Sequence, residues 1–153
     1  MTNTDQHTLL QAHYATLQAF WENVLERTGY SAIVLSAGSQ QFHFHDDQGP
    51  AFRPNPLMVQ WIAKQHIGEN AWLLIRQGAS PTLLFHQPDD FWHASTQAPM
   101  HLHEHMEIQV FSGLDALQST LAQLLATQLG SRSKVAQISE RDAPITDQCT
   151  LNP

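Results

Sequence analysis

Two stretches of the chain repeat apolar residues every three or four positions. The first runs from about residue 5 to residue 28 and is followed by Gly29, a residue suited to end a helix. The second covers residues 114–129, where leucines share one face and Gly130 follows. An apolar stripe of this width on a helix packs against a core. The sequence therefore predicts two principal amphipathic helices.

Shorter apolar or alternating runs, bounded by Gly, Pro and Ser, indicate strands. They are residues 31–36, 42–45, 71–75, 82–86, 106–111 and 134–139. Residues 57–62 fit a strand or a single helical turn. Strands and helices do not alternate strictly, so the order predicts an α/β fold with a mixed, partly antiparallel sheet of about six strands flanked by two main helices. We expect a single domain over residues 1–153, with residues 140–153 as a tail or linker.

Residues 42–61 hold the most unusual local sequence. A predicted strand, in which Phe42 and Phe44 alternate with histidines, leads into the adjacent acids Asp46 and Asp47. Pro54 and Pro56 then keep the backbone extended, because proline removes an N–H group and restricts the residue before it. Two acids at the end of a strand either cap a turn or are presented to a ligand or partner subunit.

The composition narrows the classes of partner. A chain of 153 residues with 42% hydrophobic and 14% charged residues is typical of a globular domain. Its formal charge of −7 argues against nucleic acid and anionic membrane as main partners. The single Cys149 excludes an internal disulfide framework. The sequence contains no long apolar run and no leader pattern, and we expect a cytoplasmic protein.

A histidine tract supplies the alternative site. His101, His103 and His105 alternate and are followed by Glu107. On a strand, alternate residues share one face, so three imidazoles and a carboxylate would converge on a metal ion. The other interpretation is a histidine-rich loop that leads into an ordinary strand.

Several landmarks together resemble the N-terminal domain of bacterial proline dipeptidases (prolidases), relatives of creatinase and aminopeptidase P. The resemblance covers essentially the whole chain. It is carried by residues 13–18, the Phe-His-Asp-Asp run at 44–47, the Phe-Arg-Pro-Asn-Pro turn at 52–56 with Trp61, the Asn-Ala-Trp-Leu-Leu run at 70–74, the Asp-Phe-Trp-His run at 90–93, and residues 104–108. His45 and Pro54 depart from the family's usual residues.

The resemblance implies an enzyme whose chemistry lies outside this chain. In that family a separate catalytic domain holds two divalent metals, typically manganese, which activate a hydroxide against the bond before proline. The N-terminal domain helps to form a homodimer and leans over the partner's active site. Asp47 then corresponds to the acid that reaches the substrate pocket, and Trp92 and His93 support the same wall. No catalytic or metal-binding residue is implied in this chain.

Three functions follow as hypotheses. The first is the non-catalytic N-terminal domain of a metal-dependent Xaa-Pro dipeptidase, which acts in dimerisation and in closing the pocket over a proline-containing dipeptide. Its partners are its own catalytic domain and a second subunit. The chain ends in Leu151-Asn152-Pro153, where the resemblance places the linker to the catalytic domain. The second is a small stand-alone metal-binding protein that uses the histidine tract. The third is a stand-alone ligand-binding paralogue.

Overall fold

The computed structural model describes residues 3–40, 50–89, 96–130, 133–140 and 144–153. The elements are α1 (Asn3–Thr28), β1 (Ala32–Ser36), α2 (Pro56–Val59), the 3₁₀ turn η1 (Lys64–His66), β2 (Trp72–Arg76), β3 (Thr82–His86), the 3₁₀ turn η2 (Met100–Leu102), β4 (Glu107–Phe111), α3 (Leu114–Leu129), β5 (Val135–Ile138) and β6 (Cys149–Leu151).

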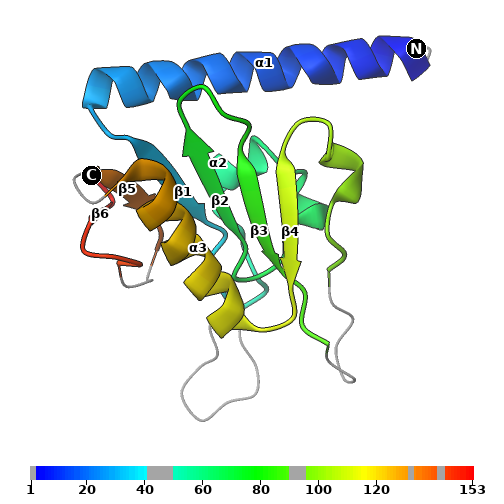
Figure 1. Cartoon of the computed structure of the whole chain (residues 1–153). Coiled ribbons are helices and arrows are strands. Elements are labelled where there is room, and N and C mark those ends of the chain that lie inside the picture. The colour runs from blue at the N-terminus through cyan, green and yellow to red at the C-terminus, as the bar shows by residue number, and fades with distance from the viewer. Residues whose placement is uncertain (1–2, 41–49, 90–95, 131–132, 141–143) are drawn as a thin grey trace.

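Within the described residues, six strands form one mixed sheet in the order β4-β3-β2-β1-β5-β6 (Figure 1). In the centre of the sheet, β2 pairs antiparallel with β1 on one side and with β3 on the other. The other three pairings, β1 with β5, β3 with β4 and β5 with β6, are parallel. This mixed sheet with helices confirms the fold class that the sequence predicts.

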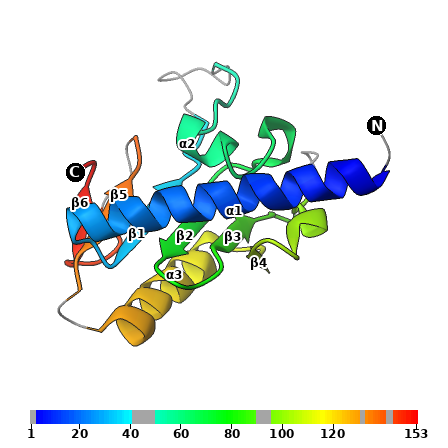
Figure 2. The same ribbon diagram turned by 90° about the horizontal axis from the view of Figure 1, so that it is seen from above.

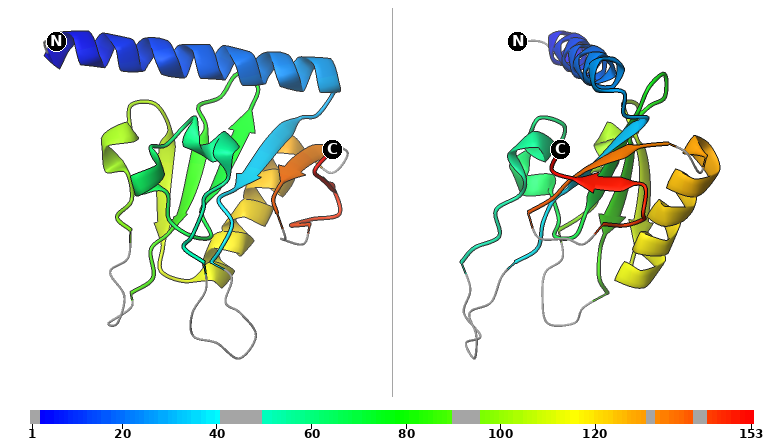
Figure 3. Two further views of the ribbon diagram at one scale, coloured as in Figure 1. Left: turned by 180° about the vertical axis from the view of Figure 1, so that it is seen from behind. Right: turned by 90° about the vertical axis from the view of Figure 1, so that its left-hand side faces the viewer.

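The two faces of the sheet carry separate apolar cores. Side chains of α3, among them Leu117, Leu121 and Leu125, pack on one face. The other face is covered by residues of α1 and by the segment around α2, η1 and η2, which lies opposite α3 (Figure 3). Viewed from above, α1 crosses the sheet at one end, with α2 and α3 on its two sides (Figure 2). Burial on both faces explains why the central strands are almost wholly apolar.

The helix boundaries follow from local sequence. Gly29 has φ of +73° and its N–H donates to the Leu25 carbonyl, so a residue without Cβ closes α1. The predicted helix 114–129 and the predicted strand 82–86 match α3 and β3 residue for residue. The predicted strand 42–45 lies outside the described residues. β1, its expected neighbour, is flanked by β2 and β5.

Part of the segment expected to be a tail belongs to the sheet. β6 pairs with β5, and the Asn152 N–H donates to the Gln137 carbonyl at 2.8 Å. The Asn152 side chain also exchanges two hydrogen bonds with the backbone of Ser139, at 2.8 and 3.0 Å. The buried Gln137 side chain accepts from the Ile145 N–H at 2.9 Å. Residues 144–152 are therefore held against β5 by backbone and side-chain hydrogen bonds.

Gly68 lies very close to Phe85 and His86 of β3. A Cβ at this position would lie 2.9 Å from Phe85 Cζ and 3.4 Å from the His86 carbonyl oxygen. Phe85 is fully buried, so its ring has little room to move. We expect Gly68→Ala to lower the free energy of unfolding by about 1–2 kcal/mol through overpacking, measured by urea denaturation. In a Phe85→Leu background the same change should cost less, and strictly additive losses would contradict the contact.

Candidate functional site

The residues predicted to line the substrate pocket are not described by the structure. Asp47, Trp92 and His93 all lie in the ranges 41–49 and 90–95, outside the described residues. Their role stays a prediction. The segment that follows Asp47 in the chain is described from residue 50 onward, and its packing defines the frame of the site.

Asn55 anchors this segment to the end of β1. Its backbone N–H donates to the Ala37 carbonyl at 3.1 Å, and its side chain accepts from the Leu57 N–H at 3.0 Å. Pro56 follows at the first position of α2, where the missing N–H costs nothing. The Asn-Pro step thus starts a short helix and fixes the segment on the sheet.

Tyr14 of α1 joins the long helix to the other end of the same segment. Its buried hydroxyl donates to the Trp61 carbonyl at 2.6 Å, and the two rings lie 6.2 Å apart. The neighbouring His13 donates from Nε2 to the Gln60 carbonyl at 2.9 Å. On its other side the Tyr14 ring stacks on His105, with centroids 4.4 Å apart. One turn of α1 therefore fixes both the segment after α2 and the segment before β4.

Replacing Tyr14 with phenylalanine tests this connection. Because the hydrogen bond is buried, its loss leaves the Trp61 carbonyl without that donor, and we expect the free energy of unfolding to fall by about 1–2 kcal/mol at pH 7. Burial raises the pKa of Tyr14 above its ordinary value of 10.0. The unfolded chain then loses this proton first as the pH rises past 10, so stability falls in that range. Urea denaturation between pH 7 and pH 11 measures both effects.

Tyr30 provides the matched control. It is half-buried and packs against the same core. Tyr30→Phe should change stability by less than about 0.5 kcal/mol. An equal loss in both variants would show that the Tyr14 hydroxyl carries no special interaction.

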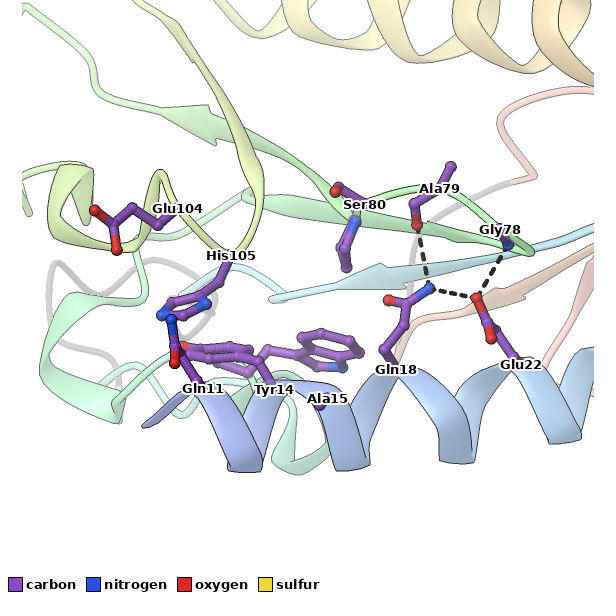
Figure 4. Close-up of a pocket in the computed structure, with 12 residues that line it drawn as sticks. Gln11, Tyr14, Ala15, Gln18, Glu22, Gly78, Ala79, Ser80, Glu104 and His105 are labelled. Carbon is purple, nitrogen blue, oxygen red and sulfur yellow. Dashed lines mark hydrogen bonds between the residues drawn. The ribbon is translucent and has the colours of Figure 1, made fainter. Parts of the chain in front are cut away.

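A groove lies between α1 and the turn that joins β2 to β3 (Figure 4). We call it the α1 groove. Its volume is about 460 Å³. Its lining residues are Gln11, Tyr14, Ala15, Gln18, Glu22, Trp61, Gly78, Ala79, Ser80, Pro81, Glu104 and His105. Its walls come from segments far apart in the chain, so no local pattern in the sequence predicts it.

One end of the α1 groove is closed by a hydrogen-bond network between helix and turn. The Gln18 amide donates to Glu22 Oε1 at 2.9 Å and to the Ala79 carbonyl at 3.2 Å, and the Gly78 N–H also donates to Glu22 Oε1 (Figure 4). Both hydrogen bonds to the carboxylate lower the pKa of Glu22, and the bond from Gln18 has the larger effect. The contribution of Glu22 to the stability of the fold is therefore present at pH values above the ordinary carboxyl pKa. It is lost as the pH falls through the lowered pKa that Glu22 has in the folded chain.

The histidine tract does not form a strand, and the convergence on one face that the sequence suggests is wrong. His101 lies in η2, and the strand β4 begins only at Glu107. The His101 ring packs edge-on against His66 at 5.1 Å, and His103 Nδ1 donates to the Met100 carbonyl at 2.9 Å. His105 stacks on Tyr14. Within the described ranges, no three His, Cys, Asp or Glu side chains come together as a metal site.

Of the helices in the described part of the chain, none combines the length and the apolar composition that a membrane span requires.

Comparisons with known proteins agree with this architecture. A putative aminopeptidase P from Bacillus anthracis has a similar fold, with a TM-score of 0.50 and 18% identity over 73% of this chain and 27% of that one. A Xaa-Pro dipeptidase of Marinobacter nauticus is 35% identical over 97 residues, which are 62% of this chain and 22% of the relative. A Xaa-Pro dipeptidase of Xanthomonas euvesicatoria is 33% identical over 91 residues, 60% of this chain and 20% of the relative. The match therefore spans about a fifth of the length of these relatives.

The family model described as "Xaa-Pro dipeptidase, N-terminal domain" matches residues 8–152. This match begins within α1 and extends through α3 and the six strands of the described sheet, and it includes the segment fixed by Asn55 and Trp61. The chain belongs to the family of Xaa-Pro dipeptidase N-terminal domains.

Proposed function

We propose that this chain is the non-catalytic N-terminal domain of a metal-dependent Xaa-Pro dipeptidase, an enzyme that hydrolyses dipeptides with a C-terminal proline. The observation that carries the proposal is the family match over residues 8–152. The relatives that share this region are about five times as long as the part that matches. In the proposal the chemistry belongs to the remaining part of such a protein.

The metals of the proposed enzyme, two divalent ions and by expectation manganese, are assigned to that catalytic region. Among the residues that the structure describes, the histidine tract does not fit them. The described histidines of the tract are engaged with His66, Met100 and Tyr14 rather than directed at a common point. The proposal therefore gives the histidine tract no metal-binding role.

The domain itself is proposed to act in two ways. It contributes to a homodimer, and it closes the substrate pocket of the partner subunit with Asp47, supported by Trp92 and His93. A carboxylate at the closed end of a pocket attracts the free amino group of a dipeptide. It disfavours a peptide that is extended at its amino end, because the nitrogen next to the carboxylate is then an uncharged amide. The anchoring of the Asn55 segment to β1 supports this role, because it fixes the chain that follows Asp47. We place the enzyme in the cytoplasm.

A domain exchange tests the proposal. This chain would replace the matching N-terminal region of the Marinobacter nauticus Xaa-Pro dipeptidase, and the chimera would be assayed on Ala-Pro with manganese. We expect hydrolysis of Ala-Pro, little hydrolysis of Ala-Ala-Pro, and a dimer in light scattering. A folded, metal-loaded chimera that is monomeric, or that cleaves both peptides equally well, would contradict the proposal.

A further inference from the structure

A second hollow lies on the face of α2 and is separate from the α1 groove. It is lined by Arg53, Pro54, Pro56, Val59 and Lys64 and has a volume of about 320 Å³. We call it the basic pocket. The volume is at the lower end of the range for small-molecule sites in proteins.

Local structure holds the walls of the basic pocket in place. Pro54 and Pro56 have fixed φ angles, and Asn55 between them is buried and bonded to β1. After α2 the chain turns inward at the buried Trp61 and Ile62 and returns to the surface at Lys64, the first residue of η1. Arg53 and Lys64 are eleven positions apart in the sequence. The anchored segment between them brings both residues to the same pocket.

The charges of the basic pocket are not used within the described structure. The side chains of Arg53 and Lys64 are exposed, and neither has an ion-pair or hydrogen-bond partner among the described residues. The chain carries 14 acidic residues against seven Lys and Arg, and two of those seven line this one hollow. In a protein of net charge −7, such a pair is a local site of attraction for an anion.

The apolar lining decides which kind of anion fits. Two prolines and Val59, which is 38% exposed, provide an apolar wall beside the cations. A guanidinium binds a carboxylate with two parallel hydrogen bonds, and an ammonium adds a second point charge. Nucleic acid would meet the negative field of the whole chain, which disfavours a polyanion. A carboxylate attached to a small apolar body satisfies both the charges and the wall.

We propose that the basic pocket binds the carboxyl-terminal end of a short peptide whose last residue is apolar. The choice of a peptide rests on the proposed function, since such an enzyme meets peptides that end in proline. The assignment of a carboxylate with an apolar body rests on the pocket alone. The site lies in this chain and requires no residue of a catalytic region.

The test uses N-acetyl-L-proline as the probe and the isolated chain as the protein, with binding followed by chemical-shift changes in NMR spectra. We expect saturable binding with a Kd on the order of 1 mM, since an open site with exposed charges binds weakly. R53Q and K64Q should each weaken binding about two- to fivefold, and the double variant should abolish it. R27Q, which removes an exposed charge in the last turn of α1, should bind as the unaltered chain does.

Two further probes separate the charge from the apolar wall. N-acetyl-L-proline amide, which lacks the carboxylate, should not bind, and acetate, which lacks the ring, should bind more weakly than the main probe. Equal binding of the amide, equal binding of acetate, no binding of the main probe, or wild-type affinity in the double variant would each overturn the proposal. Binding by the isolated chain beside an inactive chimera would count against the proposed function and not against the pocket. An active chimera whose isolated N-terminal chain does not bind the probe would count against the pocket and not against the proposed function.

Discussion

Replacing Trp61 with alanine is expected to lower the free energy of unfolding by about 3–5 kcal/mol. Trp61 is 2% exposed and lies in the core between α1 and the sheet. Its removal would leave a cavity of nearly a whole indole ring beneath Tyr14. Denaturation in urea followed by circular dichroism measures the loss without relying on tryptophan fluorescence.

Two controls make this result specific to packing. Phe20→Ala removes an aromatic ring that is 56% exposed on the same helix as Tyr14, and it should cost less than about 1 kcal/mol. Trp61→Phe keeps most of the apolar volume and removes an indole N–H that has no hydrogen-bond partner among the described residues, so it should cost much less than alanine. A loss below 1 kcal/mol for Trp61→Ala would contradict the role assigned to this residue.

The second large effect is expected on activity. In the chimera, Asp47→Asn should lower kcat/KM for Ala-Pro roughly 10- to 100-fold, because a charged hydrogen bond to the substrate's amino group is worth about 1.5–3 kcal/mol. The same change should raise the relative rate on Ala-Ala-Pro, since the charge that is proposed to select a free amino group is gone. Steady-state kinetics on both peptides measure the two effects together.

Asp46→Asn is the matched control for Asp47. It removes the same charge from the neighbouring position and should leave kcat/KM within about threefold of the unaltered chimera, because the proposal assigns the contact with the substrate to Asp47 and not to Asp46. If the two variants lose activity equally, the effect belongs to the net charge of the segment. A loss in Asp46→Asn alone would reverse the assignment of the two acids.

The sequence predicted the elements whose signal is local. The helix 114–129 and the strand 82–86 were found at their observed ends, since Gly113 and Gly130 flank the helix and Pro81 precedes the strand. These elements combine strong periodicity with clear breakers. The mixed sheet was predicted as well, because strands and helices do not alternate along the chain.

Elements that depend on distant contacts were missed. β6 has only three residues, Cys149–Leu151, and its strand geometry comes from pairing with β5 and from the bonds between Asn152 and Ser139. No alternation of three residues can indicate this in advance. For the histidine tract, the interpretation as a loop that leads into an ordinary strand is confirmed, and the alternative of a metal-binding strand face is wrong. Its spacing of two suggests a strand, but the backbone over Met100–Leu102 forms a 3₁₀ turn, and His105 is positioned by Tyr14, 91 residues earlier.

The α1 groove and the basic pocket were also absent from the sequence prediction. The α1 groove joins one helix face to a turn that lies 56 residues further along the chain at Glu22 and Gly78, and 61 at Gln18 and Ala79. No sequence pattern links the exposed Arg53 and Lys64. Both line the basic pocket because the chain between them turns inward at Trp61. A pattern of apolar positions indicates which side chains are buried, but it does not show which exposed ones become neighbours.

The rate of Ala-Pro hydrolysis by the isolated chain, measured with manganese beside the chimera at equal molar concentration, tests the central claim most directly. A non-catalytic N-terminal domain predicts that the chimera hydrolyses the dipeptide, whereas the isolated chain stays at the rate of buffer alone. Hydrolysis by the isolated chain that increases with its concentration and persists through further purification would contradict the account.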